Sequence, residues 1–588
     1  MTEEFYTQQI EKANSAIAKT SATFRLWISL RLSIFLVTAV GIYFTWGNWR
    51  FTLPIFVLGV ALFLLAVTRF EDARTALNKA KKWKELAENE QKALNGDFSM
   101  FDHGEEFRDA KHPFAHDLDL FAPHGVFQFL NRTFSPKGKK FLADLLKNGA
   151  KKPTEINELI NGLHEDLDWC MQFRVNGSVD ERKEALNGNL TFLKTFDFKN
   201  PKWMPILRFF LAFIGVASFI ALVFNLISGM IFTIIVLVNL FLVGSFLKET
   251  NRIIATIAGY EGKIKFLVDQ MALIKTLQSK NETLRAFAAR LDGGNESAIA
   301  ALKELLQIHK RFEFRMNLLV GVMLNMFLVW DFHQRIALKK WLDNYRTKIG
   351  DWEEDLVKLE AYVSGAFLKF NDGKTIFATF HESDDILVSN LRHPLISKGK
   401  VVSNNVQFDT SHRLMILTGP NMAGKSTYLR SVGLLFVLAN AGFPIFAEKA
   451  NLPRYELYSS MRTSDDLSTE SSYFYAELAR LKFILDEIES GRKIFLLLDE
   501  ILKGTNSIDK EQGSKQFLQK LKRLHTQGII ATHDLALCEL SNGSEYFFNG
   551  YFDSIIQNDE LYFDYSWKAG VCQNMNASFL LKKMKLVD

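Results

Sequence analysis

The chain has 588 residues, and its 71 Lys and Arg residues against 66 Asp and Glu residues give a formal net charge of +5. This length predicts roughly three or more structural units, and so balanced a charge gives no argument for nucleic-acid binding by itself. The three cysteines are too far apart to suggest a disulfide framework or a metal-binding pair, so a reducing, cytoplasmic setting is expected for the soluble parts: Cys170, Cys538 and Cys572.

Two apolar segments near the N-terminus predict a first membrane hairpin within residues 1–70. Residues 32–46 and 51–68 flank a short polar turn at 47–50, and aromatic side chains stand at the ends of the segments. The residues before the first segment include several acidic side chains in an amphipathic helical pattern without a cleavage motif. No cleaved signal peptide is therefore expected.

Residues 71–202 are predicted to form a soluble helical unit. Residues 73–91 are rich in Lys, Glu, Ala and Leu, all of which have a high intrinsic propensity for α-helix. A histidine-rich stretch at 112–124 has two interpretations, either a metal site or a set of helix caps and turns. Its spacing matches no zinc pattern and no cysteine assists, so caps and turns are favoured.

An uncharged run at residues 209–247 predicts a second membrane hairpin, within residues 203–250. The run of about 39 residues exceeds one span, which takes roughly 20 residues, and residues 225–229 offer a natural break. The alternative for both hairpins is a pair of buried soluble hairpins. That alternative is disfavoured because soluble helices normally keep a polar face.

Basic residues flank both hairpins, and only Arg50 lies in a connecting turn. The positive-inside rule therefore predicts a multi-pass protein of the inner (cytoplasmic) membrane. Both chain termini and the C-terminal domain are expected to face the cytoplasm, with two tiny external turns. The flanking residues are Lys12, Lys19, Arg25, Arg69, Arg74, Lys79, Lys81, Lys82, Lys199, Lys202, Arg208, Lys248 and Arg252.

Residues 251–370 are predicted to form long helical arms that carry nucleotide state to the rest of the molecule. Helical periodicity with interleaved charges covers residues 253–291, and Asp292-Gly-Gly-Asn295 breaks it. Residues 316–330 are almost wholly apolar but too short for a span, so a buried lever helix is expected. Gly350-Asp351 is expected to end one helix and start the next.

Residues 371–588 are predicted to form an α/β domain built around a phosphate-binding loop. An apolar, β-prone run from Leu414 ends in Gly419-x-x-x-x-Gly424-Lys425-Ser426, and a helical pattern follows. Glycines let backbone N–H groups curl around phosphates, Lys425 can reach the β- and γ-phosphates, and Ser426 can offer its hydroxyl to Mg²⁺. The expected cofactors are ATP and Mg²⁺. The candidate ATP-binding residues of the loop are Gly419, Pro420, Asn421, Met422, Ala423, Gly424, Lys425, Ser426 and Thr427.

Two further strands support a nucleotide site. Residues 493–498 form an apolar run that ends in Asp499-Glu500, where Asp499 would hold Mg²⁺ together with Ser426, and Glu500 would polarise the attacking water. The strand predicted at residues 528–532 is followed directly by His533, which would be placed to sense the γ-phosphate. Glu500 and His533 are thus the candidate catalytic residues. The alternative, that Asp499-Glu500 merely begins a helix and His533 lies on the surface, is disfavoured beside this loop.

These motifs resemble those of the MutS mismatch-repair ATPases. Gly419-Pro-Asn-Met-Ala-Gly-Lys-Ser-Thr-Tyr428 is similar to the family's phosphate loop with its unusual Pro-Asn-Met, and Asp499-Glu-Ile-Leu-Lys-Gly-Thr505 resembles Asp-Glu-Ile-Gly-Arg-Gly-Thr. Ala531-Thr-His533 and Asn390-Leu-Arg-His-Pro394 also match family motifs. A weaker helical resemblance covers residues 117–190, like the start of the family's lever domain.

The resemblance implies a homodimer in which each nucleotide lies between one subunit's phosphate loop and the other's signature segment. Counting back from Glu477 places the signature serine at Ser472, which would act in trans as well as capping a helix. Glu470 and Leu502 stand where family members carry glycine. The ring that would stack on adenine has no evident counterpart near Val401-Val402.

The predicted fold class is an α/β P-loop ATPase domain of the ABC class at the C-terminus, joined to an all-α lever and core region with two transmembrane helical hairpins. Residues 546–556 and 561–565 are expected to pair as a closing β-hairpin, followed by Lys568-Ala-Gly570 near the partner subunit.

Three functions remain open. The first is a membrane-tethered MutS-like ATPase coupled to double-stranded DNA, although no segment ahead of the lever is long enough for a mismatch-reading domain. The second is an ABC-class switch that acts on membrane or protein partners without DNA. The third, a transporter, is disfavoured because four spans with tiny turns offer few helices for a pathway.

Overall fold

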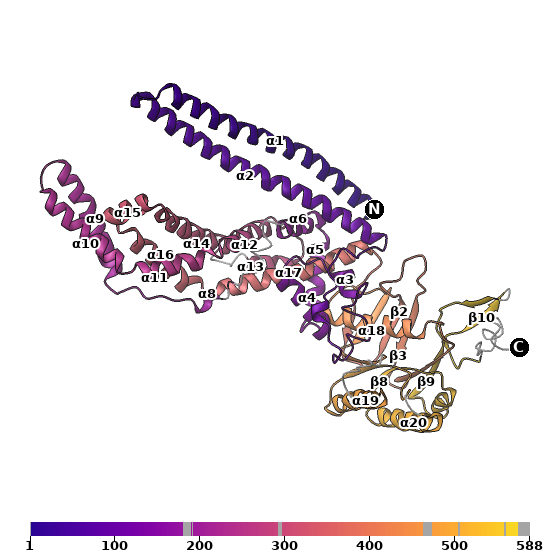
Figure 1. The fold of residues 1–588 in the computed structure, drawn as a ribbon. Helices are drawn as coiled ribbons and strands as arrows, with labels where there is room; N and C mark the ends of the chain where they lie inside the picture. Colours follow the sequence, from indigo (N-terminus) through magenta and orange to yellow (C-terminus); the bar gives the residue numbers. More distant parts are fainter. Residues whose placement is uncertain are drawn as a thin grey trace.

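The computed structural model describes residues 2–179, 190, 192–291, 297–461, 473–503, 506–557 and 560–573. An elongated helical region occupies most of the chain, and an α/β domain forms its C-terminal end (Figure 1). The helical region ends in two tips that lie on the same side of the molecule in Figure 1, far from the α/β domain.

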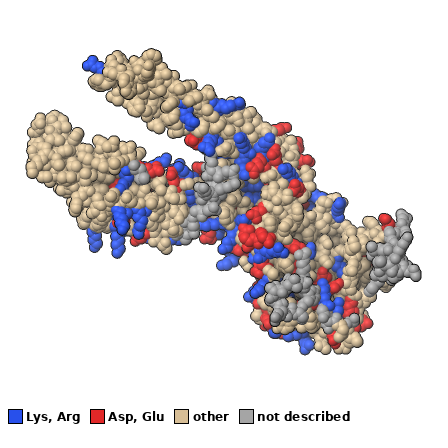
Figure 2. Space-filling model, in the orientation of Figure 1, with Lys and Arg blue, Asp and Glu red and all other residues tan. Residues whose placement is uncertain are grey.

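The first tip belongs to a pair of very long antiparallel helices. Helices α1 (Thr2–Phe44) and α2 (Trp49–Leu94) pack along each other and are joined by a short turn. Each helix continues without a break from the apolar segment into the polar segment that was expected beside it. Their outer halves expose apolar side chains and are almost free of charge in Figure 2.

The second tip is a cluster of three apolar helices rather than a simple hairpin. Helices α9 (Met204–Val223) and α10 (Gly229–Gly244) are separated at residues 224–228, where the apolar run was expected to break. A third helix, α15 (Leu318–Leu328), packs against both of them. Gly215 on α9 allows the closest approach, since a Cβ there would come within 2.5 Å of the Phe327 carbonyl oxygen.

The expectation that α15 is a buried lever helix is wrong. Leu318 and Leu319 are 79% and 76% exposed, and only Gly321 and Asn325 of this helix are buried. The helix lies on the outside of α9 and α10, so most of its apolar side chains face away from the protein.

Several helices are long and apolar enough to cross a membrane. Within the described residues these are α1, α2 and α9. A fourth span results if α10 and α11 (Leu247–Ala258), which bend by 55° at their junction, are taken as one.

The rest of the helical region is built of shorter helices than the periodicity indicated. The segment 253–291 is not one long helix, because it breaks after Ala258 and again after Ile274. The break expected at Gly350-Asp351 is also misplaced, since α17 already begins at Lys348 and carries Gly350 in its first turn. The helices are η1 (Glu105–Phe107), α3 (Val126–Leu130), α4 (Pro136–Asn148), α5 (Pro153–His164), α6 (Leu167–Ser178), α8 (Phe192–Thr195), α12 (Glu261–Ile274), α13 (Glu282–Leu291), α14 (Ala298–Glu313), η3 (Phe314–Met316), α16 (Trp330–Tyr345) and α17 (Lys348–Asn371).

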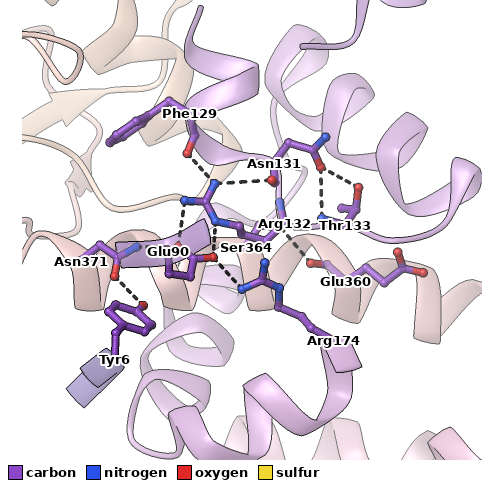
Figure 3. Close-up of polar contacts among 10 residues, drawn as sticks. All are labelled: Tyr6, Glu90, Phe129, Asn131, Arg132, Thr133, Arg174, Glu360, Ser364 and Asn371. Carbon is purple, nitrogen blue, oxygen red and sulfur yellow. Dashed lines mark hydrogen bonds and ion pairs between the residues drawn. The ribbon is translucent and has the colours of Figure 1, made fainter. Parts of the chain in front are cut away.

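Helix α17 is the axis that leads from this region into the α/β domain. It packs against α4, α5, α6 and α13 and ends just before the first strand of that domain. At its C-terminal half, a buried network joins α17 to the long N-terminal helices (Figure 3). Tyr6 donates to Asn371 at 2.7 Å, and Asn371 donates to Glu90 at 3.1 Å.

Glu90 is the centre of this network. Arg132 donates to both of its carboxylate oxygens, at 2.6 and 3.0 Å, and Arg174 donates to one of them at 2.6 Å (Figure 3). Burial alone would raise the pKa of Glu90, but the two guanidinium groups outweigh it and hold that pKa below its usual value. A buried carboxylate with these partners fixes α2 against α6 and α17, because removing Glu90 would leave two buried guanidinium groups without a counter-charge.

The α/β domain is centred on a six-stranded sheet with the order β12-β9-β4-β8-β7-β6. All neighbouring strands are parallel except β12, which pairs with β9 in the antiparallel sense. The strands are β4 (Leu414–Thr418), β6 (Glu456–Ser460), β7 (Ile494–Asp499), β8 (Gln527–Ala531), β9 (Phe547–Tyr551) and β12 (Lys568–Ala569).

Both faces of this sheet are covered, as expected for a parallel sheet whose strands are apolar throughout. Met415 and Leu417 of β4 point toward α18 (Lys425–Ala441), whereas Leu414 and Ile416 belong to a second core under α19 (Tyr473–Glu489) and α20 (Ser507–Arg523). A short helix, η4 (Leu535–Ser541), follows β8.

A second sheet and a separate hairpin complete the domain. The second sheet has the order β1-β5-β2-β3, and β10 pairs only with β11. The hairpin expected between 546–556 and 561–565 is therefore smaller than predicted, because β9 leaves it to pair with β4. The strands are β1 (Thr379–His381), β2 (Ile386–Leu391), β3 (Asn404–Phe408), β5 (Lys449–Pro453), β10 (Ser554–Gln557) and β11 (Glu560–Phe563).

Candidate functional site

The loop between β4 and α18 has the backbone that a phosphate cradle needs. Gly419 and Gly424 have φ angles of +141° and +107°, which favour glycine. Gly419 also passes so close to Phe552 that a Cβ would come within 2.5 Å of its carbonyl oxygen. Helix α18 begins at Lys425 without a side-chain cap, so its first N–H groups are available to an anion.

Lys425 is folded back onto the loop that precedes it. Its ammonium group donates to the carbonyl oxygens of Gly419 and Pro420 at 2.7 and 3.1 Å, and the side chain is buried. Burial lowers the pKa of Lys425, while the nearby Asp499 and Glu500 oppose this shift. The lysine is thus held at the loop, next to the helix N-terminus.

Three strand ends bring acidic and basic side chains to the same place. Ser426 donates to the Asp499 carboxylate at 2.7 Å, which links the start of α18 to the end of β7. Glu500 lies 3.1 Å from His533, which follows β8, and the same imidazole nitrogen lies 3.4 Å from the Lys425 ammonium.

Glu500 is held in its charged form by this arrangement. The contact with His533 lowers the pKa of Glu500 to about 2, although burial works in the other direction. Its φ angle of +54° is unusual for a residue with a side chain, and Leu502 shares this feature at +58°. The backbone after β7 is therefore constrained where the candidate catalytic carboxylate lies.

Glu477, a buried glutamate, holds the constrained backbone that follows Glu500. Glu477 on α19 accepts hydrogen bonds from the backbone N–H groups of Leu502 and Lys503, at 2.6 and 3.0 Å. The segment after Glu500 is thereby fixed to the helix that follows the predicted signature serine. The only sequence signal for this contact is an acidic residue on an otherwise apolar helix face.

These residues line one cavity of about 800 Å³. Pro420, Asn421, Met422, Gly424, Lys425, Ser426, Thr427, Asp499, Glu500 and His533 contribute to its wall. Of the predicted loop residues, Gly419 and Ala423 lie behind the wall instead. The cavity is large enough for a nucleotide and has polar groups at one end, as ligand sites commonly do.

Aromatic side chains also line this cavity. Tyr562, Phe563 and Tyr565 belong to the β10–β11 hairpin and the residues after it, and they line the same cavity as Val401 and Val402. The rings of Phe563 and Tyr565 stack with their centres 6.0 Å apart. Sequence reasoning looked for a ring near Val401-Val402 and missed these, because only the tertiary fold brings the hairpin there.

Two residues of the Arg-His-Pro motif have different roles: Arg392 makes a structural contact, and His393 lines the cavity. Arg392 forms a two-fold contact with Asp372 at 2.7 and 2.8 Å, which fixes the start of the domain to the end of α17. His393 lines the cavity, and burial lowers its pKa to about 4. Arg392 therefore has a positioning role, and His393 faces the candidate ligand as a neutral ring.

Other predicted residues lie elsewhere. Ser472 and Glu470 are outside the described residues, as are Gly504 and Thr505. In the histidine-rich stretch, His112 accepts hydrogen bonds from the N–H groups of Phe114 and Ala115, at 3.4 and 3.3 Å. This ring caps a turn, as the favoured interpretation had it.

Comparison with known proteins identifies the C-terminal domain. The family model for MutS domain V matches residues 415–586. Through this domain, the chain is similar to the MutS family. The match confirms a MutS domain V at the C-terminus, next to a helix-rich N-terminal region that contains apolar helices.

Several bacterial relatives named DNA mismatch repair protein MutS share this part of the chain. The protein of Thermotoga maritima is 32% identical over 192 residues, which are 32% of this chain and 24% of the relative. The protein of Thermosipho melanesiensis is 31% identical over 209 residues, which are 35% and 25% of the two chains. That of Clostridium botulinum is 34% identical over 171 residues, or 28% and 18%. The chain thus spans about a quarter or less of the length of these curated relatives.

Proposed function

We propose that this MutS-family chain is a membrane-tethered ATPase that binds and hydrolyses ATP at a site shared by two subunits, coupled to the binding of double-stranded DNA. One observation carries the proposal. Lys425, Ser426, Asp499, Glu500 and His533 come from three separate segments and meet in one cavity that aromatic side chains also line.

The polar end of the cavity fits a magnesium triphosphate. The Lys425 ammonium donates to two carbonyl oxygens of the loop itself. It can exchange these acceptors for phosphate oxygens while it stays at the loop. The Ser426 hydroxyl and the Asp499 carboxylate lie 2.7 Å apart and offer the oxygen donors that Mg²⁺ prefers. When bound, Mg²⁺ would neutralise charge on the phosphates.

Glu500 is the proposed general base and His533 its partner. The carboxylate is ionised and directed by the imidazole at 3.1 Å, so it can accept a proton from a water molecule beside the terminal phosphate. His533 also lies next to Lys425, where it can sense whether that lysine has moved to the phosphates. The rings of Phe563 and Tyr565 would cover the nucleotide base by stacking.

The second subunit would complete the site. The resemblance to MutS proteins implies that Ser472 of one subunit faces the phosphates of the other in a homodimer. Within one subunit, Glu477 ties the helix after Ser472 to the backbone beside Glu500. A change at the nucleotide could therefore be passed to the dimer contact through α19.

The two apolar tips are proposed to lie in the lipid bilayer of the cytoplasmic membrane. Both tips expose large apolar side chains, and charged residues gather over the remaining surface in Figure 2. Exposed apolar surface of this extent is stable in lipid rather than in water. The basic flanks of the hairpins support a cytoplasmic location for both termini and the ATPase domain.

The coupling to DNA rests on the relatives, which are named for mismatch repair. An ABC-class switch that acts on membrane or protein partners is the second candidate, and a specific observation favours it. The end of the helical region carries the apolar cluster of α9, α10 and α15, where a DNA clamp would need basic side chains.

One experiment separates the two candidates. The purified full chain is assayed for ATP turnover in lipid vesicles with and without duplex DNA, at low and high salt. A MutS-like coupling predicts turnover that changes with DNA, and an effect that weakens at high salt because phosphate contacts release counterions. Turnover that DNA leaves unchanged at every salt concentration would reject the DNA coupling and leave the switch.

A further inference from the structure

Three side chains that commonly bind metals meet where α12 contacts α14, remote from the nucleotide cavity. Glu261 is the first residue of α12. His309 and Glu313 lie four residues apart on α14, so they share one face of that helix. The facing ligand atoms of the three residues all lie within 4.8 Å of one another.

The distances fit joint ligands of one ion better than hydrogen-bond partners. The His309 Nε2 atom lies 3.5 Å from an oxygen of Glu261 and 3.5 Å from an oxygen of Glu313. Two ligand atoms that each lie about 2.0–2.1 Å from a tetrahedral ion are about 3.4 Å apart. A good N–H···O hydrogen bond is shorter, at about 2.7–3.2 Å.

The state of His309 is an independent observation that points to a ligand. The residue is 1% exposed, its Nδ1 atom has no hydrogen-bond partner within the part of the chain that the structure describes, and its Nε2 atom has only the two long contacts with Glu261 and Glu313. Buried polar atoms are nearly always satisfied, so this pair requires an explanation. An ion between Nε2 and the two carboxylates would satisfy the nitrogen that points toward them.

Glu261 is already oriented for such a role. Lys265 pairs with one of its carboxylate oxygens, while the other oxygen faces His309. Outer contacts of this kind commonly orient a metal ligand. Glu313 is half-exposed, which leaves a path by which an ion can enter from solvent.

We propose that Glu261, His309 and Glu313 bind one divalent transition-metal ion, with Zn²⁺ as the best match. An imidazole combined with carboxylates suits Zn²⁺ and its neighbours in the first transition series, whereas Mg²⁺ and Ca²⁺ prefer oxygen ligands alone. Two carboxylates balance the charge of the ion, and a water molecule completes the coordination. The ion would join α12 to α14 in the arm between the apolar cluster and the centre of the helical region.

Cobalt absorption tests this site directly. The full chain in detergent is stripped with a chelator and titrated with Co²⁺ without nucleotide, in excess Mg²⁺ to occupy oxygen-only sites. The expected result is one Co²⁺ per chain with the visible absorption of a low-coordinate site, which Zn²⁺ displaces. His309→Gln should weaken binding at least about a hundredfold, because even lost outer contacts cost roughly 10–100-fold.

Matched variants control for the position and for folding. His164→Gln removes another partly buried histidine, on α5, and Glu304→Gln removes an exposed carboxylate of α14; both should bind Co²⁺ like the parent. Glu313→Gln lies at an exposed position and decides the result should His309→Gln fail to fold. Absence of Co²⁺ binding, or equal binding by Glu313→Gln and the parent, would overturn the proposal. No nucleotide is present, so the outcome is independent of the proposed ATPase function.

Discussion

Single residues in this protein act through the charge that their surroundings impose on them. Glu500 is kept ionised by His533, and Glu90 by Arg132 and Arg174. Glu360 on α17 is the opposite case, because burial raises its pKa to about 7. It accepts hydrogen bonds from the Ser135 hydroxyl and from the backbone N–H groups of Phe134 and Ser135, which oppose the shift without cancelling it.

The raised pKa of Glu360 predicts a pH dependence of stability. The folded chain binds this proton more tightly than the unfolded chain, whose glutamate has a pKa of about 4.5. Its contribution to stability is therefore full below about pH 4.5 and is lost as pH rises to about 7. Glu360→Gln mimics the protonated form. The melting temperature of this variant minus that of the parent should therefore increase between about pH 4.5 and 7 and stay constant above pH 7.

Thermal unfolding in detergent between pH 4.5 and 8 measures that difference. Glu354→Gln, an exposed carboxylate on the same helix, serves as the control and should show no such gain. A difference between Glu360→Gln and the parent that does not change with pH would show that folding does not raise the pKa of Glu360.

At the scale of elements, local sequence patterns were sufficient to predict the strands and the phosphate loop, whose formation depends on neighbouring residues in the sequence. The strands that end at Thr418, Asp499 and Ala531 follow from apolar runs, and the phosphate loop follows from its glycines. Tyr565 and Glu477 could not be found in this way, because their roles depend on contacts far along the chain. Nothing in the residues near Val401 predicts a ring supplied more than a hundred residues later.

The error over α15 has a different origin. An apolar segment of this length indicates burial, but the pattern does not tell protein from lipid as the surroundings. In the fold, α15 packs against α9 and α10 and leaves Leu318 and Leu319 exposed. The exposed leucines are accounted for if this helix rests in the bilayer alongside two spanning helices.

That placement of α15 can be tested with lipid quenchers. A fluorophore on Leu319→Cys should be quenched by lipids that carry brominated acyl chains, as should one on Phe213→Cys in α9, because both side chains are largely exposed. A fluorophore on Glu304→Cys in α14 provides the control in water. If quenching at Leu319 does not exceed that at Glu304, then α15 contacts protein or water rather than lipid.

At the scale of the whole molecule, α2, α17 and the network around Glu90 connect the first apolar tip to the α/β domain, which contains the proposed nucleotide cavity. Arg392 continues this connection by binding Asp372 at the entrance to the α/β domain. The network around Glu90 and the Arg392–Asp372 pair both consist of buried or partly buried charged contacts. Such contacts have defined geometry, so movement at the cavity can be carried toward the first tip.

The proposed membrane topology predicts where the chain can be labelled. An impermeant thiol reagent on intact cells should modify Asn48→Cys and Leu226→Cys, which lie in the two turns, and should not reach Ser490→Cys in the α/β domain. The three natural cysteines are buried and should stay silent. The protein should also remain with membranes after alkaline washing, because apolar burial in lipid does not depend on charge. Recovery in the soluble fraction without detergent would reject the membrane placement.

The central claim, ATP hydrolysis with Glu500 as base, is tested most directly by steady-state turnover of the full chain in lipid vesicles. Glu500→Gln should bind ATP like the parent but turn it over at least about a hundredfold more slowly, since a general base contributes roughly 10²–10⁴-fold. Lys425→Ala should fail to bind ATP, and Glu489→Gln, an exposed carboxylate on α19, should match the parent. Turnover by Glu500→Gln at the parental rate would contradict the account.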